Sequence, residues 1–276
     1  MLYVPAAMSF GKVRIVLHRP ANADNLGAAA RVMMNFGLSR LAVVVPPAWA
    51  GAPRGGGDGT AQDDVLKRAA RLARHATVLL DRAEFHPDLA SALGQATWVC
   101  GTSSRELPGR PRLSPRQLGE EVARRAPTGD LALVFGEEQR GLSDAELELC
   151  HAVCTIPTSP DYDSMNLAQA VAVLCYELAC GGGAVAAVEG PASGPRGGVR
   201  ALPSDPARHA TVEALWARLQ ALLTAAGYLN PQNPEQILAE WRRLLTRAEP
   251  TQREVELLLA AVRSLERTVA AGPGGR

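Results

Sequence analysis

Short runs of β-branched and other apolar residues recur along the first two thirds of the chain. They predict strands at residues 13–17, 41–45, 78–80, 98–101, 131–135 and 153–156. Between most of these runs, apolar residues recur with helical spacing and predict helices at residues 26–36, 63–74, 87–93, 115–125 and 143–149. Because alternating strands and helices form βαβ units, the pattern indicates an α/β fold with a largely parallel sheet covered on both faces.

The pattern changes after residue 180. Glycine and proline make up 11 of the 26 residues in the segment 181–206, which predicts a flexible linker. Three later segments, 212–223, 237–245 and 255–262, again have helical spacing, and Thr251 with Glu254 has the form of a capping box. The sequence therefore predicts an α/β domain at 1–180, a linker at 181–206 and a small all-α extension at 207–276.

Composition narrows the class of protein. An apolar content of 47% can build a real core, and no run approaches the roughly 20 apolar residues that a membrane span requires. The five cysteines are an odd number and lie in apolar segments, as expected for reduced thiols of a cytoplasmic protein. A net charge of +1 is no signature of nucleic-acid binding, so contact with RNA must depend on local clusters of arginine.

Cys150 and Cys154, with His151 between them, have one feature of a metal site. No second pair with zinc-finger spacing accompanies them. We therefore interpret both thiols as small buried side chains and expect no metal.

Four groups of residues are candidates for chemistry. The first is Asn25-Leu26-Gly27-x-x-x-Arg31, after the first strand. Asn25 can cap the helix that follows, Gly27 permits close approach of another group, and Arg31 projects from the second turn. Taken alone, this motif is also what an ordinary capped helix with a surface arginine looks like.

The second group follows the strand at 131–135. Gly136, Glu138 and Gly141 form a turn at the carboxyl end of that strand, before the capping box of Ser143 and Glu146. Ligands of α/β proteins bind at that end of the sheet, and glycines there leave backbone groups accessible. The alternative is a purely structural acidic turn.

The third group contains Ile156, Ser164, Asn166 and Leu167, before a helix that reaches Ala179. Ser164 is the expected cap of this helix. The helix is apolar nearly all round and must bury more than one face, which a homodimer interface would allow.

The fourth group is a proline-rich loop with four arginines that could bind several phosphates, although a solvated loop would have the same composition. These are Arg105, Arg110, Arg112 and Arg116.

These groups, in this order and together with Gly101-Thr102-Ser103, resemble the TrmH-like branch of the SPOUT RNA 2′-O-ribose methyltransferases, and most of all the TrmJ type with its helical extension. The resemblance covers nearly the whole chain. It implies a deep trefoil knot at the C-terminal end of the α/β domain, a rare exception to the rule against knotted chains. Two features depart from the family: the long glycine-rich linker, and the arginines in segment 67–75.

The resemblance also implies a cofactor, S-adenosylmethionine, and roles for individual residues. The catalytic residues would be Arg31, Asn25 and Ser164. The cofactor would be held by Gly101, Thr102, Ser103, Gly136, Glu138, Gly141, Ile156, Ser164, Asn166 and Leu167.

The implied substrate is tRNA at the 5′-most nucleotide of the anticodon loop (position 32), with help from the helical tail that contains Trp216, Trp241, Arg242, Arg243 and Arg247. The spacing of the two tryptophans places them in the core of the tail. Methylation of ribosomal RNA or of another tRNA position is the first alternative, and a noncatalytic RNA-binding protein on the same fold is the second. A nucleotide-binding oxidoreductase is disfavoured, because no Gly-x-Gly-x-x-Gly follows the first strand.

Overall fold

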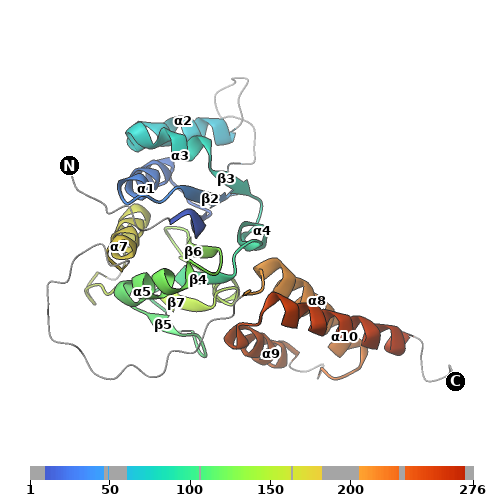
Figure 1. The fold of residues 1–276 in the computed structure, drawn as a ribbon. Coiled ribbons are helices and arrows are strands. Elements are labelled where there is room, and N and C mark those ends of the chain that lie inside the picture. Colours follow the sequence, from blue (N-terminus) through green and yellow to red (C-terminus); the bar gives the residue numbers. More distant parts are fainter. Residues whose placement is uncertain are drawn as a thin grey trace, which may run out of the picture. The chain divides into compact units, whose positions relative to one another are not determined.

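The structure of the chain is a computed structural model that describes residues 10–46, 49, 61–105, 107–162, 164–181, 205–229 and 234–270. The chain divides into two compact units, an α/β unit and a helical unit formed mainly by the residues after 200 (Figure 1). Each unit is described by itself.

The α/β unit contains a seven-stranded sheet in the order β3-β2-β1-β6-β4-β7-β5, in which every strand pair is parallel. The predicted parallel sheet is therefore confirmed. Its strands are β1 Val13–His18, β2 Arg40–Val44, β3 Glu84–His86, β4 Trp98–Thr102, β5 Arg112–Leu113, β6 Leu131–Phe135 and β7 Ala152–Cys154.

The helices of this unit cover the sheet. Three of them, α1, α7 and α5, lie in a row along one side of it, with α2 beyond α1 (Figure 1). The bounds are α1 Ala23–Asn35, α2 Ala61–Ala73, α3 Thr77–Asp81, α4 Leu89–Leu93, α5 Pro115–Arg125, α6 Asp144–Leu147 and α7 Leu167–Ala179, with single 3₁₀ turns at Phe10–Lys12 and Arg74–Ala76.

Two glycines set the distance between helices. A Cβ atom on Gly27 of α1 would lie 2.0 Å from the carbonyl oxygen of Ala69 on α2. One on Gly119 of α5 would lie 2.6 Å from the carbonyl oxygen of Glu177 on α7. Gly27 does permit close approach, as predicted, but the group that approaches is the backbone of a neighbouring helix.

The core lies between the helices and the central strands. Every residue of β1 and β6 is buried, because these two strands are in the middle of the sheet with neighbours on both edges and layers on both faces. The strongest apolar runs of the sequence are thus the central strands.

Two predictions of secondary structure were wrong. Residues 78–80 belong to helix α3, and the strand of this region is β3, a few residues later. A three-residue apolar run is too short to distinguish the period of a strand from that of a helix. Here Leu79 and Leu80 are buried side chains of a short helix. The edge strand β5 was missed, because its two residues, Arg112 and Leu113, contain no apolar run.

The helical unit consists of α8 His209–Ala225, α9 Pro234–Ala248 and α10 Gln252–Ala270, which confirms the all-α extension. The amide of Thr251 donates to Glu254 at 2.7 Å and the amide of Glu254 donates to the Thr251 hydroxyl at 3.2 Å, so the capping box is present. Most of the predicted linker, residues 182–204, lies outside the described residues, and the domain boundaries stay predictions. Within the described part, no helix combines the length and apolar character needed to cross a membrane.

Candidate functional site

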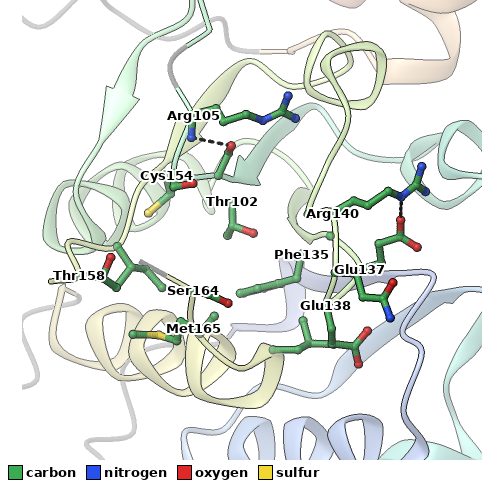
Figure 2. A pocket seen from close by; sticks show the side chains of 18 residues that line it. Thr102, Arg105, Phe135, Glu137, Glu138, Arg140, Cys154, Thr158, Ser164 and Met165 are labelled. Atoms are coloured by element: carbon green, nitrogen blue, oxygen red, sulfur yellow. Dashed lines mark hydrogen bonds and ion pairs between the residues drawn. The ribbon is translucent and has the colours of Figure 1, made fainter. Parts of the chain in front are cut away.

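A cavity of about 290 Å³ opens at the carboxyl ends of β4, β6 and β7. Three chain segments line it, at 102–105, 135–141 and 154–170. Figure 2 shows Thr102, Phe135 and Ser164 facing the same open space from these three segments. The position is the one at which parallel α/β sheets bind ligands.

Most of the residues that the sequence assigned to the cofactor meet at this cavity. Eight of the ten line it: Thr102, Ser103, Gly136, Glu138, Gly141, Ile156, Ser164 and Leu167. The other two are outside the lining. Gly101 is buried behind it, where a Cβ atom would lie 2.9 Å from the sulfur of Cys150, so its small size serves packing. Asn166 lies between two lining residues and acts through hydrogen bonds.

A chain of polar contacts joins the first, second and third predicted groups. One carboxylate oxygen of Glu138 accepts from the side-chain amide of Asn25 at 2.7 Å. The side-chain amide of Asn166 donates to the side-chain oxygen Oδ1 of Asn25 at 3.0 Å. Glu138 also accepts from the backbone amides of Ala21 at 2.8 Å and Asn22 at 3.3 Å. The turn after β6, the start of α1 and the start of α7 are therefore held together by one carboxylate and two amides.

These contacts correct two predicted helix caps. The cap of α1 is Asn22, whose side-chain oxygen accepts from the amide of Asp24 at 2.9 Å, and Asn25 lies inside the helix. The cap of α7 is Asn166, which accepts from the amide of Ala168 at 2.9 Å, and not Ser164. Both asparagines suit a cap, but tertiary contacts decide which residue of a polar segment takes the role.

The turn between Gly136 and Gly141 has little room. The amide of Gly141 donates to the carbonyl of Glu137 at 2.9 Å, and a Cβ atom on Gly136 would lie 2.2 Å from the carbonyl carbon of Gly141. Gly141 has a φ of 67°, which a residue with a side chain rarely adopts. Glu137 and Arg140 form an ion pair across the turn (Figure 2). These two glycines are needed for the backbone path itself.

The predicted capping box of α6 is also present, and it is connected to a buried histidine that the sequence analysis did not single out. Glu146 accepts from the amide of Ser143 at 2.7 Å and lies 2.7 Å from Nε2 of His18. Burial lowers the pKa of His18, although the carboxylate of Glu146 opposes this. Burial alone would raise the pKa of Glu146, but hydrogen bonds from Ser143 and the charge of His18 outweigh it and lower the pKa. The pair fixes the end of β1 to the helix behind the cavity.

Three of the four loop arginines bind the protein itself. Arg105 lines the cavity, donates to the carbonyl of Leu142 and forms an ion pair with Asp144 at 2.9 Å. Arg110 is only 9% exposed and donates to the carbonyl of Glu148 at 2.8 Å, which disagrees with its predicted role on an RNA-binding surface.

Arg112 donates to the hydroxyl of Thr155 at 2.9 Å, whereas Arg116 is exposed and, among the described residues, has no hydrogen bond or ion pair. The loop is therefore largely a structural clamp on the segments around the cavity, and RNA contact by it stays a prediction.

Arg31 is exposed on α1 and is absent from the lining of the cavity. Within the described part of the chain it makes no hydrogen bond or ion pair. Asn25, its partner in the predicted motif, is attached to the cavity only through Glu138 and Asn166.

The two cysteines of the possible metal motif have no exposed thiolate. Cys150 and Cys154 are buried, and burial raises the pKa of each thiol to about 12. Among the described residues no group of three or more His, Cys, Asp or Glu side chains could hold a metal ion. Both thiols pack as small apolar groups, in agreement with the sequence-based interpretation.

Replacing Glu138 by Gln tests the polar chain. Ala21 donates to one carboxylate oxygen, and Asn22 and Asn25 donate to the other. An amide nitrogen cannot accept a hydrogen bond, so Gln would leave the donors on one of these two sides unpaired. We expect the free energy of unfolding to fall by about 1–2 kcal/mol and hydrogen exchange to accelerate at Ala21 or Asn22, whichever amide loses its acceptor. Replacing the adjacent exposed Gln139 by Ala is the matched control and should change neither. Unchanged exchange in the Glu138→Gln protein would contradict the assigned contacts.

Comparison with known proteins agrees with this geometry. Residues 12–176 match the model of the SpoU rRNA Methylase family, and residues 210–273 match that of the tRNA methyltransferase TrmJ, C-terminal domain. The chain is 33% identical over 256 residues to the tRNA (cytidine/uridine-2′-O-)-methyltransferase TrmJ of Cronobacter sakazakii, covering 92% of this chain and 96% of that one. The corresponding protein of Pectobacterium atrosepticum is 32% identical over 265 residues, covering 93% of this chain and 97% of that one.

Solved structures of related proteins support the same family assignment. The crystal structure of TrmJ from Z. mobilis ZM4 superimposes with a TM-score of 0.70 at 29% identity, covering 92% of this chain and 98% of that one. A putative methylase family protein from Neisseria gonorrhoeae has a TM-score of 0.58 at 32% identity, covering 78% of this chain and 98% of that one. The chain therefore belongs to the SpoU family of SPOUT methyltransferases, and its C-terminal domain assigns it to the TrmJ type.

Proposed function

We propose that this protein transfers a methyl group from S-adenosylmethionine to the 2′-hydroxyl of a pyrimidine ribose in tRNA, at position 32 of the anticodon loop. The observation that carries the proposal is the meeting of eight predicted cofactor residues at one cavity. The relatives that match along nearly their whole length support the substrate class, since they are named as tRNA (cytidine/uridine-2′-O-)-methyltransferases. The match to relatives named as tRNA-modifying enzymes favours the cytoplasm as its location.

The cavity suits the proposed cofactor. Its volume is close to the lower end of the range for small-molecule sites. Phe135, Ile156 and Leu167 provide an apolar wall for an adenine ring, and the glycines at 136 and 141 leave backbone groups accessible at the rim. When bound, S-adenosylmethionine supplies an activated methyl group on a sulfonium, so the transfer needs no metal.

The chain's own residues must orient the ribose and stabilise the charge that develops on its oxygen. A guanidinium stays protonated in proteins and cannot accept a proton. We therefore assign Arg31 to stabilising the developing alkoxide while bridging a substrate phosphate, and the proton passes to phosphate or water. Ser164, whose side chain faces the cavity, would position the ribose (Figure 2). Asn25 would act as a positioning residue through Glu138.

A homodimer is part of the proposal. Helix α7 packs between α1 and α5, and these two helices of the same chain bury most of its apolar surface. Met34 of α1, at 45% exposure, and Tyr176 of α7, at 54%, remain uncovered, and the ring of Tyr176 lies edge-on to Phe36 with 6.2 Å between centroids. Arg31 is one turn before Met34 on the same side of α1. A second copy seated on this face would place Arg31 at the border of the interface.

The trefoil knot and the role of the tail are further parts of the proposal. Strand β7 lies between β4 and β5, and the segment after it returns to the cavity beside the two earlier segments, an arrangement that suits a threaded chain end. In the tail, Trp216 is 8% exposed with the guanidinium of Arg242 5.5 Å from its ring, so this tryptophan is part of the core, as predicted. Any contact of the tail with tRNA would come from its exposed polar face.

The proposed reaction is tested by incubating the full chain with S-adenosylmethionine and unmodified tRNA transcripts that have cytidine or uridine at position 32, followed by mapping of 2′-O-methylated riboses. We expect one mark, at that nucleotide. Ribosomal RNA fragments in a parallel reaction are the control. Methylation of the fragments alone would favour the rRNA alternative, and no methylation of either RNA would favour a noncatalytic protein.

Replacing Arg31 by Lys tests whether methyl transfer requires the planar guanidinium group. Lysine keeps the charge but loses the planar fork that can bridge two oxygens, so we expect the single-turnover rate to fall by roughly 100-fold, as when one preorganised donor is lost. Arg82→Lys, at an exposed position on the end of α3, is the control and should leave the rate unchanged. A near-normal rate in the Arg31→Lys protein would refute the proposed role.

The dimer is tested by Met34→Glu. An unpaired carboxylate in a buried apolar contact costs several kcal/mol, so we expect the dimer dissociation constant to rise roughly 100-fold or more in sedimentation experiments. Tyr228→Glu, at an exposed tyrosine of the helical unit, is the control. A Met34→Glu protein that sediments like the wild type would exclude this face as the interface.

A further inference from the structure

A run of positive charge lies on the later turns of helix α2 and on the turn that follows it, between Asp63 and Asp64 on one side and Asp81 on the other. Residues 65–80 contain Lys67, Arg68, Arg71 and Arg74 and no acidic residue. The whole chain has a net charge of only +1, so the rest of it has a net charge of −3. The average charge therefore conceals a segment of +4.

These four side chains are exposed and have few protein partners. Lys67 lies 3.9 Å from Asp64, which is a weak contact at the surface. Arg68, Arg71 and Arg74 make no hydrogen bond or ion pair with any residue that the structure describes. In this respect they differ from the arginines at 105, 110 and 112, which bind carbonyl, carboxylate or hydroxyl groups of the protein.

The spacing of these cations destabilises α2, because it brings like charges together. Lys67 and Arg71 are four residues apart and Arg68 and Arg71 are three apart, so like charges are neighbours on the helix surface. The favourable interaction of cations with the carboxyl end of a helix offsets this repulsion only in the last turn. A partner with regularly spaced negative charges would remove the repulsion.

The fold directs these charges outward. Ala69 and Ala73 are buried, and Ala69 is in contact with Gly27 of α1, so this side of α2 faces α1. Lys67 and Arg71 are on the opposite side of the helix, since residues two positions from Ala69 point away from the contact. Figure 1 shows α2 at the edge of the α/β unit, beyond α1, which is the helix that contains Arg31.

We propose that the outer face of α2 and the turn after it, with Lys67, Arg68 and Arg71 on the helix and Arg74 on the turn, binds phosphates of the tRNA backbone. The inference rests on the proposed function and adds a binding surface to it. Three of the four cations are arginines, whose fork matches two phosphate oxygens. An anionic membrane is a poorer fit, because a helix that inserts at a lipid surface needs a broad free apolar face, and α2 exposes one large apolar side chain, Leu72, at 42%.

The test compares two variants of the full chain with equal changes in charge. The first is Lys67→Gln, Arg71→Gln; the second is Lys12→Gln, Arg82→Gln, at exposed positions of the same unit outside α2. Each lowers the net charge by two, so an effect of total charge appears equally in both. Glutamine is a good helix former, and thermal unfolding verifies that both variants fold.

In the α2 variant we expect the tRNA dissociation constant to rise at least tenfold at about 0.1 M salt. The slope of log affinity against log salt should become shallower by roughly 0.7–0.9 for each lost phosphate contact. KM for tRNA should rise while kcat at saturating tRNA changes little, which a merely structural role of α2 would not produce.

Equal weakening in both variants, or unchanged tRNA binding in the α2 variant, would overturn the inference. So would binding of the wild type, through these residues, to vesicles of anionic lipid but not to tRNA. Failure of the wild type to methylate tRNA would instead overturn the proposed function, and the binding measurements distinguish the two failures.

Discussion

The carboxylate of Glu138 is the contact on which the arrangement of the site depends. It accepts from two backbone amides before α1 and from the side chain of Asn25, which in turn accepts from Asn166 at the start of α7. Hydrogen bonds to an ionised acceptor are stronger than those between neutral groups. One charged side chain and two amides therefore hold the start of α1 to two segments that follow it by more than a hundred residues in the sequence.

The glycines of the site act through the same segments in a different way. Gly136 and Gly141 let the turn after β6 fold back on itself, which brings Glu138 within reach of α1. Gly27 lets α1 approach α2, and Gly119 lets α5 approach α7. Close packing of these helices and tight turns at the strand ends are two consequences of the absence of a side chain.

Arginine has three separate uses in this protein. Arg105 and Arg110 bind carbonyl groups around the cavity and stabilise the loops. Arg31 is exposed on α1 and is the candidate for charge stabilisation in catalysis. The arginines of α2 have no protein partners in the described chain and form a separate positive surface. A residue type that recurs in a motif can thus have structural or functional roles according to what lies within reach of it.

The sequence by itself determined the parallel α/β class, the helical tail, the family and eight of the residues around the cavity. The fold class and the tail depend on local periodicity, and the family and the cavity residues depend on the resemblance that the short motifs carry. Only the tertiary structure decided that Asn22 and Asn166 cap the helices, that residues 78–80 are helical, and that Arg110 is buried. Each of these depends on contacts with residues distant in sequence, such as the hydrogen bonds that Glu138 accepts from Asn22 and Asn25 or burial within the fold, and such contacts have no signature in the residues nearby.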